Sequence, residues 1–319
     1  MGATMLASMI MSNTATTAMV IAGVLPLLTT LGKESGVSKA LLLGIPMAAS
    51  TGGMATIIGT PPNAIAVGLL KNAGVEIEFI DWMIYGVPLA IILTSVCCLV
   101  LILIFLKDKT PIPIDFLEDQ RSDTSKESLT QRRIVSGVII ITVGLWLTTS
   151  LHGLTVASVC AVPLVILTLT GVLEGKDIQG LPWDTLLLVA GGLSLGIALE
   201  NTGLLTHYGN ILISMELKSI FLIFIFAYLT MLVSNIMSNS AASTVMIPLG
   251  MAILAGFKLE VALIIAFAAS SAMFLPVSTP PNAIVFSTGL IQQKDFRIGG
   301  ILVGLLGPLL GILWVLLIN

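Results

Sequence analysis

Long apolar runs follow one another along almost the whole chain, and several are about 20 residues long. A helix of that length crosses roughly 30 Å of hydrocarbon, whereas a strand would alternate at every second residue, which these runs do not do. The pattern therefore predicts an all-α membrane protein with several spans. The expected spans are 83–106, 134–150, 155–173, 184–200 and 298–318, with further apolar segments at 1–11, 14–31, 40–71, 218–237 and 241–256 and around 278–282.

One hydrophilic stretch, 107–133, holds six Lys or Arg and six Asp or Glu residues and divides the chain into two halves. A second, weaker polar segment, 203–216, is typical of an interfacial piece. These changes of composition predict four regions, with boundaries at 1–107, 108–133, 134–217 and 218–319. The 108–133 region is expected to be a cytoplasmic linker.

Two polar signatures interrupt the apolar sequence, and each occurs once in each half. MSNTATTAMV at 11–20 returns as MSNSAASTVM at 237–246, and GTPPNAIA at 59–66 returns as STPPNAIV at 278–285. Helix breaks at matching positions of two membrane halves are the best sequence indication of a transporter's binding site. The order is the same in both halves, which predicts an internal repeat.

The paired prolines predict broken transmembrane helices. Proline removes a backbone donor and frees the carbonyl four residues earlier, here those of Ile57 and Ile58 in the first half and of Pro276 and Val277 in the second. Each break then presents carbonyl oxygens that suit a small cation and a helix N-terminus that suits an anion. Four breaks that meet at the midplane would form a site for one anion flanked by cations, with the amides of Asn13 and Asn239 serving both.

The Ser-Asn segments are expected to be re-entrant hairpins, because polar residues are dense at their tips. Hydropathy and charge alone leave open whether they dip into the membrane or cross it. With 107–133 in the cytoplasm, all 14 Lys and Arg residues except Lys71, Lys218 and Lys258 fall on the inside. The first hairpin then opens to the cytoplasm and the second to the outside, so the repeats are inverted.

Composition agrees with a membrane protein and narrows the chemistry. Mean hydropathy is +1.07, and 10% of residues are charged, against roughly 25% in soluble domains. No Lys or Arg lies within a span, so a bound anion would need cations and helix dipoles, which favours coupling to sodium. The chain has no catalytic constellation, which argues against an enzyme. His152 and His207 are expected in outer loops, and Trp82 is expected to be an interface anchor or to pack at the end of a span.

The two halves are unequal in length before their Ser-Asn motifs. About 106 residues separate Arg133 from Asn239, whereas 12 precede Asn13. The spans that would match 134–217 in the first half are missing from this sequence. We therefore expect a chain truncated at its N-terminus by about 95 residues or more, without the first scaffold half.

The paired Ser-Asn and Pro-Pro-Asn motifs resemble the divalent anion:sodium symporter family of dicarboxylate, citrate and sulfate transporters, and the resemblance covers essentially the whole chain. It implies scaffold spans in 134–217, transport elements in 1–107 and 218–319, and an elevator-type motion. It also implies two sodium sites and one substrate site. Their residues would be Ser8, Ser12, Asn13 and the Gly59 carbonyl for the first sodium; Ser234, Asn239 and the Met237 and Ser278 carbonyls for the second; and Asn13, Thr14, Thr60, Pro61, Asn239, Ser240, Thr279 and Pro280 for the substrate.

The function that follows is sodium-coupled symport of a divalent anion, foremost a C4 dicarboxylate such as succinate. The expected setting is a bacterial inner membrane, with lipid and a second copy of the full-length chain as partners and no nucleic acid. Ser240 replaces the threonine at position 14 of the first motif, which leaves the choice of anion open. A sulfate symporter, a sodium-independent exchanger and an inactive membrane fragment are the alternatives.

Overall fold

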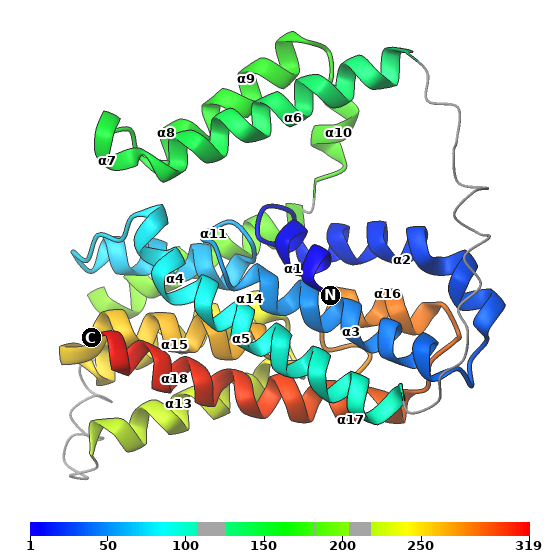
Figure 1. The fold of residues 1–319 in the computed structure, drawn as a ribbon. Helices are drawn as coiled ribbons and strands as arrows, with labels where there is room; N and C mark the ends of the chain where they lie inside the picture. Colours follow the sequence, from blue (N-terminus) through cyan, green and yellow to red (C-terminus); the bar gives the residue numbers. More distant parts are fainter. Residues whose placement is uncertain (107–125, 182, 204–217) are drawn as a thin grey trace. The chain divides into compact units, whose positions relative to one another are not determined.

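The computed structural model describes residues 1–106, 126–181, 183–203 and 218–319, except for the side chains of 126–128, 196, 199 and 200. Within these ranges the chain forms helices and no strands, as predicted (Figure 1). Most of the linker, the expected interfacial segment 203–216 except its first residue, and His207 lie outside the described residues. Four helices are long and apolar enough to cross a membrane: 13–31, 79–105, 129–147 and 293–318.

The motif-bearing elements of the first half are five helices. They are α1 (Gly2–Ser8), α2 (Asn13–Leu31), α3 (Gly36–Gly53), α4 (Pro61–Asn72) and α5 (Phe79–Phe105). Both predicted breaks are present: the chain leaves the helix between α1 and α2, at the first Ser-Asn motif, and again between α3 and α4. Ser12 caps α2, and Pro61 begins α4, because a proline at the first helical position loses no hydrogen bond.

The motif-bearing elements of the second half repeat this order. They are α13 (Ser219–Ser234), α14 (Asn239–Ile253), η2 (Ala255–Phe257), α15 (Lys258–Ser270), α16 (Pro280–Ser287), η3 (Gln293–Asp295), α17 (Phe296–Gly299), the π-helical η4 (Gly300–Leu305) and α18 (Leu306–Ile318). Ser238 caps α14 as Ser12 caps α2, and Pro280 begins α16 as Pro61 begins α4.

Between the two sets lie α6 (Lys126–Leu147), α7 (Thr149–His152), α8 (Val156–Val159), α9 (Ala161–Leu169), α10 (Gly175–Gln179) and α11 (Trp183–Asn201). The expected span 155–173 is thus two shorter helices. The imidazole of His152 is engaged locally, since Nδ1 accepts from the Leu154 N–H at 3.0 Å and Nε2 lies 2.9 Å from the Leu145 carbonyl. A neutral ring with its proton on Nε2 satisfies both contacts.

The described chain divides into two compact units, considered separately here. One contains Met1–Ile77, Trp82–Pro111 and Thr185–Asn319, and the other contains Glu78–Asp81 and Ile112–Asp184, as far as these ranges are described. In the first unit the two repeats interlock: α2 packs on its own α3 and on α16 of the other repeat, whereas α14 packs on its own α15 and on α4. The second arm of each hairpin, α2 or α14, therefore contacts helices from both repeats.

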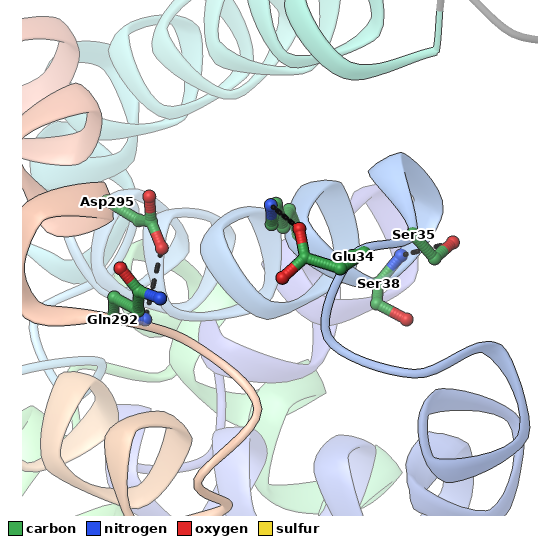
Figure 2. A network of polar contacts seen from close by, with 6 residues as sticks. Glu34, Ser35, Ser38, Gln292 and Asp295 are labelled. Carbon is green, nitrogen blue, oxygen red and sulfur yellow. Dashed lines mark hydrogen bonds and ion pairs between the residues drawn. The ribbon is translucent and has the colours of Figure 1, made fainter.

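The α2–α3 loop and the loop after α16 line a small polar pocket of about 170 Å³ in the first unit (Figure 2). Lys39 pairs with Glu34 at 3.4 Å, and the Asp295 carboxylate accepts from the Gln292 N–H at 3.0 Å. Lys33, Lys39 and Lys294 all border this pocket. Their proximity agrees with the prediction that both loops lie on the same side of the membrane.

Candidate functional site

The first hairpin tip brings three oxygen atoms together. The hydroxyl of Ser8, at the end of α1, lies 2.8 Å from Oδ1 of Asn13 and 2.7 Å from the carbonyl oxygen of Ala49. Ser8 is fully buried, and Asn13 is the first residue of α2. The tip is thereby joined to the last turns of α3.

The second hairpin tip contains the same arrangement. The hydroxyl of Ser234, at the end of α13, lies 2.7 Å from Oδ1 of Asn239 and 2.8 Å from the carbonyl oxygen of Ala269 on α15. In both tips the serine and the asparagine are five residues apart. The internal repeat predicted from the sequence thus extends to individual hydrogen bonds.

Each cluster has more acceptors than protons. A serine hydroxyl carries a single proton, yet it lies within hydrogen-bond distance of an amide oxygen and a backbone carbonyl oxygen. Hydroxyl, amide and carbonyl oxygens are also the neutral ligands that a small hard cation takes from unwound and terminal helix segments. Among the described residues no three His, Cys, Asp or Glu side chains gather to hold a metal ion. The oxygen clusters at the two tips are therefore the arrangement that suits a monovalent cation.

Close glycine contacts fix the position of Asn13 in the first repeat. A Cβ atom on Gly53 would lie 2.3 Å from Oδ1 of Asn13, and one on Gly59 would lie 2.4 Å from the Gly53 carbonyl oxygen. Gly59, a predicted sodium ligand through its carbonyl, is thus packed against Gly53 and lies next to the Ser8–Asn13 cluster. Counted back from the Thr-Pro-Pro-Asn motifs, Ala272 stands at the position of Gly53 in the second repeat.

The asparagine of each Thr-Pro-Pro-Asn motif holds its break. Nδ2 of Asn63 donates to the carbonyls of Gly53 at 2.9 Å and Thr56 at 2.7 Å. Nδ2 of Asn282 donates to the carbonyl of Leu275 at 3.0 Å and lies 3.4 Å from that of Met273. Both side chains are fully buried, and within the described part of the chain Oδ1 of each has no hydrogen-bond partner.

Trp82 supports the first break from outside the motif. Its indole is fully buried, and Nε1 donates to the Met54 carbonyl at 3.0 Å. Of the two expected roles of Trp82, an interface anchor or packing at a span end, the buried indole agrees with the second. In the residues that the structure describes, the carbonyls of Ile57 and Ile58 accept no hydrogen bond. They are the two that the sequence predicted to be freed.

Each tip has a second attachment to its break, and here the repeats differ. In the first, the hydroxyl of Thr56 donates to the carbonyl of Met9. In the second, Oδ1 of Asn235 accepts from the N–H of Phe274 at 2.9 Å, while its Nδ2 donates to the Met231 carbonyl at 2.8 Å. The attachment is retained although the residues that provide it are not.

The predicted substrate residues lie at the four helix N-termini. Asn13 and Thr14 begin α2, Asn239 and Ser240 begin α14, and the first-turn N–H groups of these helices have no partner within the helix. At α4 and α16 the first two residues are prolines, which have no N–H. The donors left there are the hydroxyls of Thr60 and Thr279, both buried next to the half-buried Pro61 and the exposed Pro280.

The remaining predicted sodium ligands are Ser12, Ser278 and Met237, which are not among the hydrogen-bonded pairs of the two tips. Oγ of Ser12 accepts from the Ala15 N–H at 3.2 Å as the cap of α2. The hydroxyl of Ser278 donates to the Leu275 carbonyl at 2.8 Å, and the backbone carbonyl of Ser278 is the predicted sodium ligand. Met237 lies in the second tip and is exposed. The structure thus joins Ser8 to Asn13 and Ser234 to Asn239 directly, and Gly59 lies against Gly53, which contacts Asn13.

Comparison with known proteins places the chain in a family. The citrate transporter family CitMHS matches residues 1–262. The chain belongs to this family. An uncharacterized transporter of Methanocaldococcus jannaschii is 32% identical over 304 residues, which cover 92% of this chain and 67% of that protein. The sodium-dependent dicarboxylate transporter SdcS of Staphylococcus saprophyticus is 30% identical over 302 residues, which cover 86% of this chain and 58% of that protein.

Membership of the citrate transporter family confirms the resemblance stated from the motifs. The protein is an integral, multi-pass membrane protein of a transporter family. Bacterial relatives, including an uncharacterized transporter of Haemophilus influenzae that is 32% identical over 321 residues, support the predicted plasma-membrane location. The chain spans about two thirds or less of the length of these relatives.

Several residues of this citrate transporter family member act in the site although sequence reasoning gave them no role. They are Ala49 and Ala269, which supply helix carbonyls, and Asn63, Asn282 and Trp82, which hold the breaks. A signal existed for the alanines, since Ala-Ala-Ser occurs at 48–50 and again at 268–270. For Trp82 none existed, because its partner is a backbone carbonyl 28 residues away.

Proposed function

We propose that this protein performs sodium-coupled symport of a divalent anion, with a C4 dicarboxylate such as succinate as its substrate. The observation that carries the proposal is the duplicated cluster of serine, asparagine and helix-carbonyl oxygens at the two hairpin tips. The SdcS relative is named a sodium-dependent dicarboxylate transporter, which supports the same substrate class.

Each cluster would hold one sodium ion as cargo. In the first, Ser8, Asn13 and the Ala49 carbonyl would be joined by the Gly59 carbonyl and Ser12. In the second, Ser234, Asn239 and the Ala269 carbonyl would be joined by the carbonyls of Met237 and Ser278. A cation resolves the shortage of protons at Ser8 and Ser234, because all the converging oxygen lone pairs then face a positive charge.

The anion would bind between the two sodium ions. When Oδ1 of Asn13 and Asn239 faces sodium, the Nδ2 groups turn toward the space in front of the helix N-termini and donate to a carboxylate. The first-turn N–H groups of α2 and α14 and the hydroxyls of Thr14, Thr60, Ser240 and Thr279 would complete the donors, against Pro61 and Pro280. Sodium thus binds first and orients the amides, which couples the two cargoes.

The transport cycle in this proposal uses inverted repeats. The two tips are re-entrant hairpins from opposite sides, and the interlocking of α2 with α16 and of α14 with α4 supports their motion as one body. That body would move in an elevator manner against scaffold spans in 134–217, within a lipid-embedded homodimer.

Uptake into proteoliposomes tests the proposal. Radiolabelled succinate and sulfate would be supplied with and without an inward sodium gradient, and we expect succinate uptake that the gradient stimulates. Asn13→Ala and Asn239→Ala should each abolish the stimulation, whereas Asn72→Ala, at the exposed end of α4, should leave it unchanged. Unchanged uptake in the first two variants would refute the site.

The same experiment separates the alternatives. Sodium-stimulated sulfate uptake without succinate uptake would identify a sulfate symporter, for which the smaller Ser240 leaves a different space. Succinate counterflow that ignores sodium would identify an exchanger. The absence of all three activities in folded protein would identify an inactive membrane fragment.

A further inference from the structure

Three buried hydroxyls next to the first oxygen cluster have no hydrogen-bond partner within the described ranges. They are those of Thr16 and Thr17 on α2 and Ser50 on α3, each at most 1% exposed. A buried polar group without a partner is unfavourable and calls for a ligand, an ion or a water molecule that satisfies it. None of the three belongs to the sodium or substrate contacts proposed above.

Helical geometry places these hydroxyls together. Thr16 and Thr17 follow Asn13 by three and four residues, so they share its face of α2, and Ser50 precedes Gly53 by three residues on one face of α3. Asn13 lies against Gly53, and α2 and α3 pack antiparallel (Figure 1). One turn away from the tip, the two helices therefore bring Thr16, Thr17 and Ser50 to the same level, adjacent to Ala49.

The second repeat shows what these positions do without a ligand. Ala242 stands in place of Thr16, Ser243 in place of Thr17 and Ser270 in place of Ser50. Ser243 donates to the Asn239 carbonyl at 2.8 Å, and Ser270 donates to the Ala266 carbonyl at 3.0 Å. Both hydroxyls are satisfied by their own helix four residues back. The first repeat has one more hydroxyl and leaves all three unsatisfied.

The helix backbone does not forbid such bonds in the first repeat. Thr51, the neighbour of Ser50, donates to the carbonyl of Met47 four residues back at 2.9 Å. The oxygens of Thr16, Thr17 and Ser50 are therefore free to accept a hydrogen bond or to ligate an ion. The last turn of α3 adds the negative end of its dipole at this level, which favours a positive charge.

We propose that Thr16, Thr17 and Ser50 form a further sodium site, present in the first repeat only. It lies one turn deeper than the Ser8–Asn13–Ala49 cluster. The three hydroxyl oxygens ligate the ion with their lone pairs. The site rests on the proposed sodium coupling and adds one sodium ion to it.

Sodium-linked thermal stability of the purified full chain tests the site. The unfolding temperature is measured against sodium concentration, with choline keeping the ionic strength constant, and is converted to a free energy of unfolding. The slope of that free energy against the logarithm of the sodium concentration reports the number of ions bound. In the triple variant Thr16→Val, Thr17→Val, Ser50→Ala we expect the slope to fall by one ion. The matched control, Ser243→Ala with Ser270→Ala, should keep the wild-type slope.

A milder variant covers the case in which the triple variant does not fold. Thr16→Ala with Thr17→Ser installs the residues of the second repeat, whose backbone already accommodates them. It too should lose one ion from the slope. An unchanged slope in a folded variant of either kind would overturn the further site, because the hydroxyls would then hold a water molecule or nothing.

Failure of this site is distinct from failure of the proposed function. If wild-type protein shows no sodium-dependent stabilisation, both are overturned. If wild-type protein and the repeat-two control respond to sodium and the repeat-one variants respond equally, only the further site is overturned. Asn13→Ala provides the reference for losing the ion of the first cluster.

Discussion

The two repeats are alike where they present oxygen atoms and unlike where they pack. Serine, asparagine and an alanine carbonyl meet at both tips with nearly the same distances, and an asparagine holds each break. The most distant backbone carbonyl that this asparagine contacts is ten residues before Asn63 in the first repeat and nine residues before Asn282 in the second. Gly53 allows Asn13 to approach closely, and Ala272 stands at the corresponding position. The oxygen clusters and the break-holding asparagines are thus retained in both repeats, whereas the second contacts that attach each tip to its break differ.

The largest expected effect comes from removing the close approach of Asn13 to Gly53. Gly53→Ala puts a methyl group 2.3 Å from Oδ1 of Asn13, so the Asn13 amide must shift out of its contact with Ser8. We expect sodium-stimulated uptake to fall to the background. Gly23→Ala on α2, where a Cβ atom has open space, is the control and should retain uptake. Full activity of Gly53→Ala would show that Asn13 need not lie on Gly53.

Much of this architecture could be predicted from sequence because the relevant signals are local. Apolar run length fixes the helices, paired prolines fix the starts of α4 and α16, and serine before a helix fixes the caps of α2 and α14. The freed carbonyls of Ile57 and Ile58 follow from proline chemistry alone. The pairing of Ser8 with Asn13 has no such local signal, since the role of Ser8 was implied by the resemblance to the symporter family.

What could not be predicted depends on contacts between distant segments. The carbonyl of Ala49 is 41 residues from Ser8, and Trp82 is 28 residues from Met54. Asn63 was visible in a repeated motif, but its role required knowing that the break folds back on it. The division of 155–173 into α8 and α9 likewise has no strong local signal.

A second, smaller effect compares the two break-holding asparagines. Asn63→Leu leaves the Gly53 carbonyl buried without a donor, at a cost of about 1–3 kcal/mol, and removes one of the two hydrogen bonds to the Thr56 carbonyl, which keeps the Gly59 N–H. Asn282→Leu should cost less, because one of its two backbone contacts is already 3.4 Å long. Thermal unfolding in detergent would measure both, with Asn72→Leu on the exposed end of α4 as control. Equal losses at 63 and 282 would contradict this ranking.

A third effect concerns the attachment of the first tip to its break. Thr56→Val removes the hydroxyl that donates to the Met9 carbonyl, which should cost about 1 kcal/mol and loosen the tip. We expect the sodium concentration for half-maximal uptake to rise severalfold while maximal uptake is retained. Thr51→Val, which also removes a buried hydroxyl from the first repeat but not from the tip, is the comparison. The same rise in both variants would mean that the effect is not specific to the tip.

The smallest expected effect is one that the two repeats share. Oγ of Ser12 accepts from the Ala15 N–H at 3.2 Å, and Oγ of Ser238 accepts from the Ala241 N–H at 3.1 Å. Ser12→Ala and Ser238→Ala should therefore each cost about 1 kcal/mol as lost helix caps, measured by thermal unfolding. Because the proposed first sodium site includes Ser12 and the second does not include Ser238, we expect the sodium requirement to rise in Ser12→Ala alone. The first cluster then differs from the second in its chemistry as well as in its packing, whereas equal losses with unchanged sodium dependence would show that both hydroxyls serve only as caps.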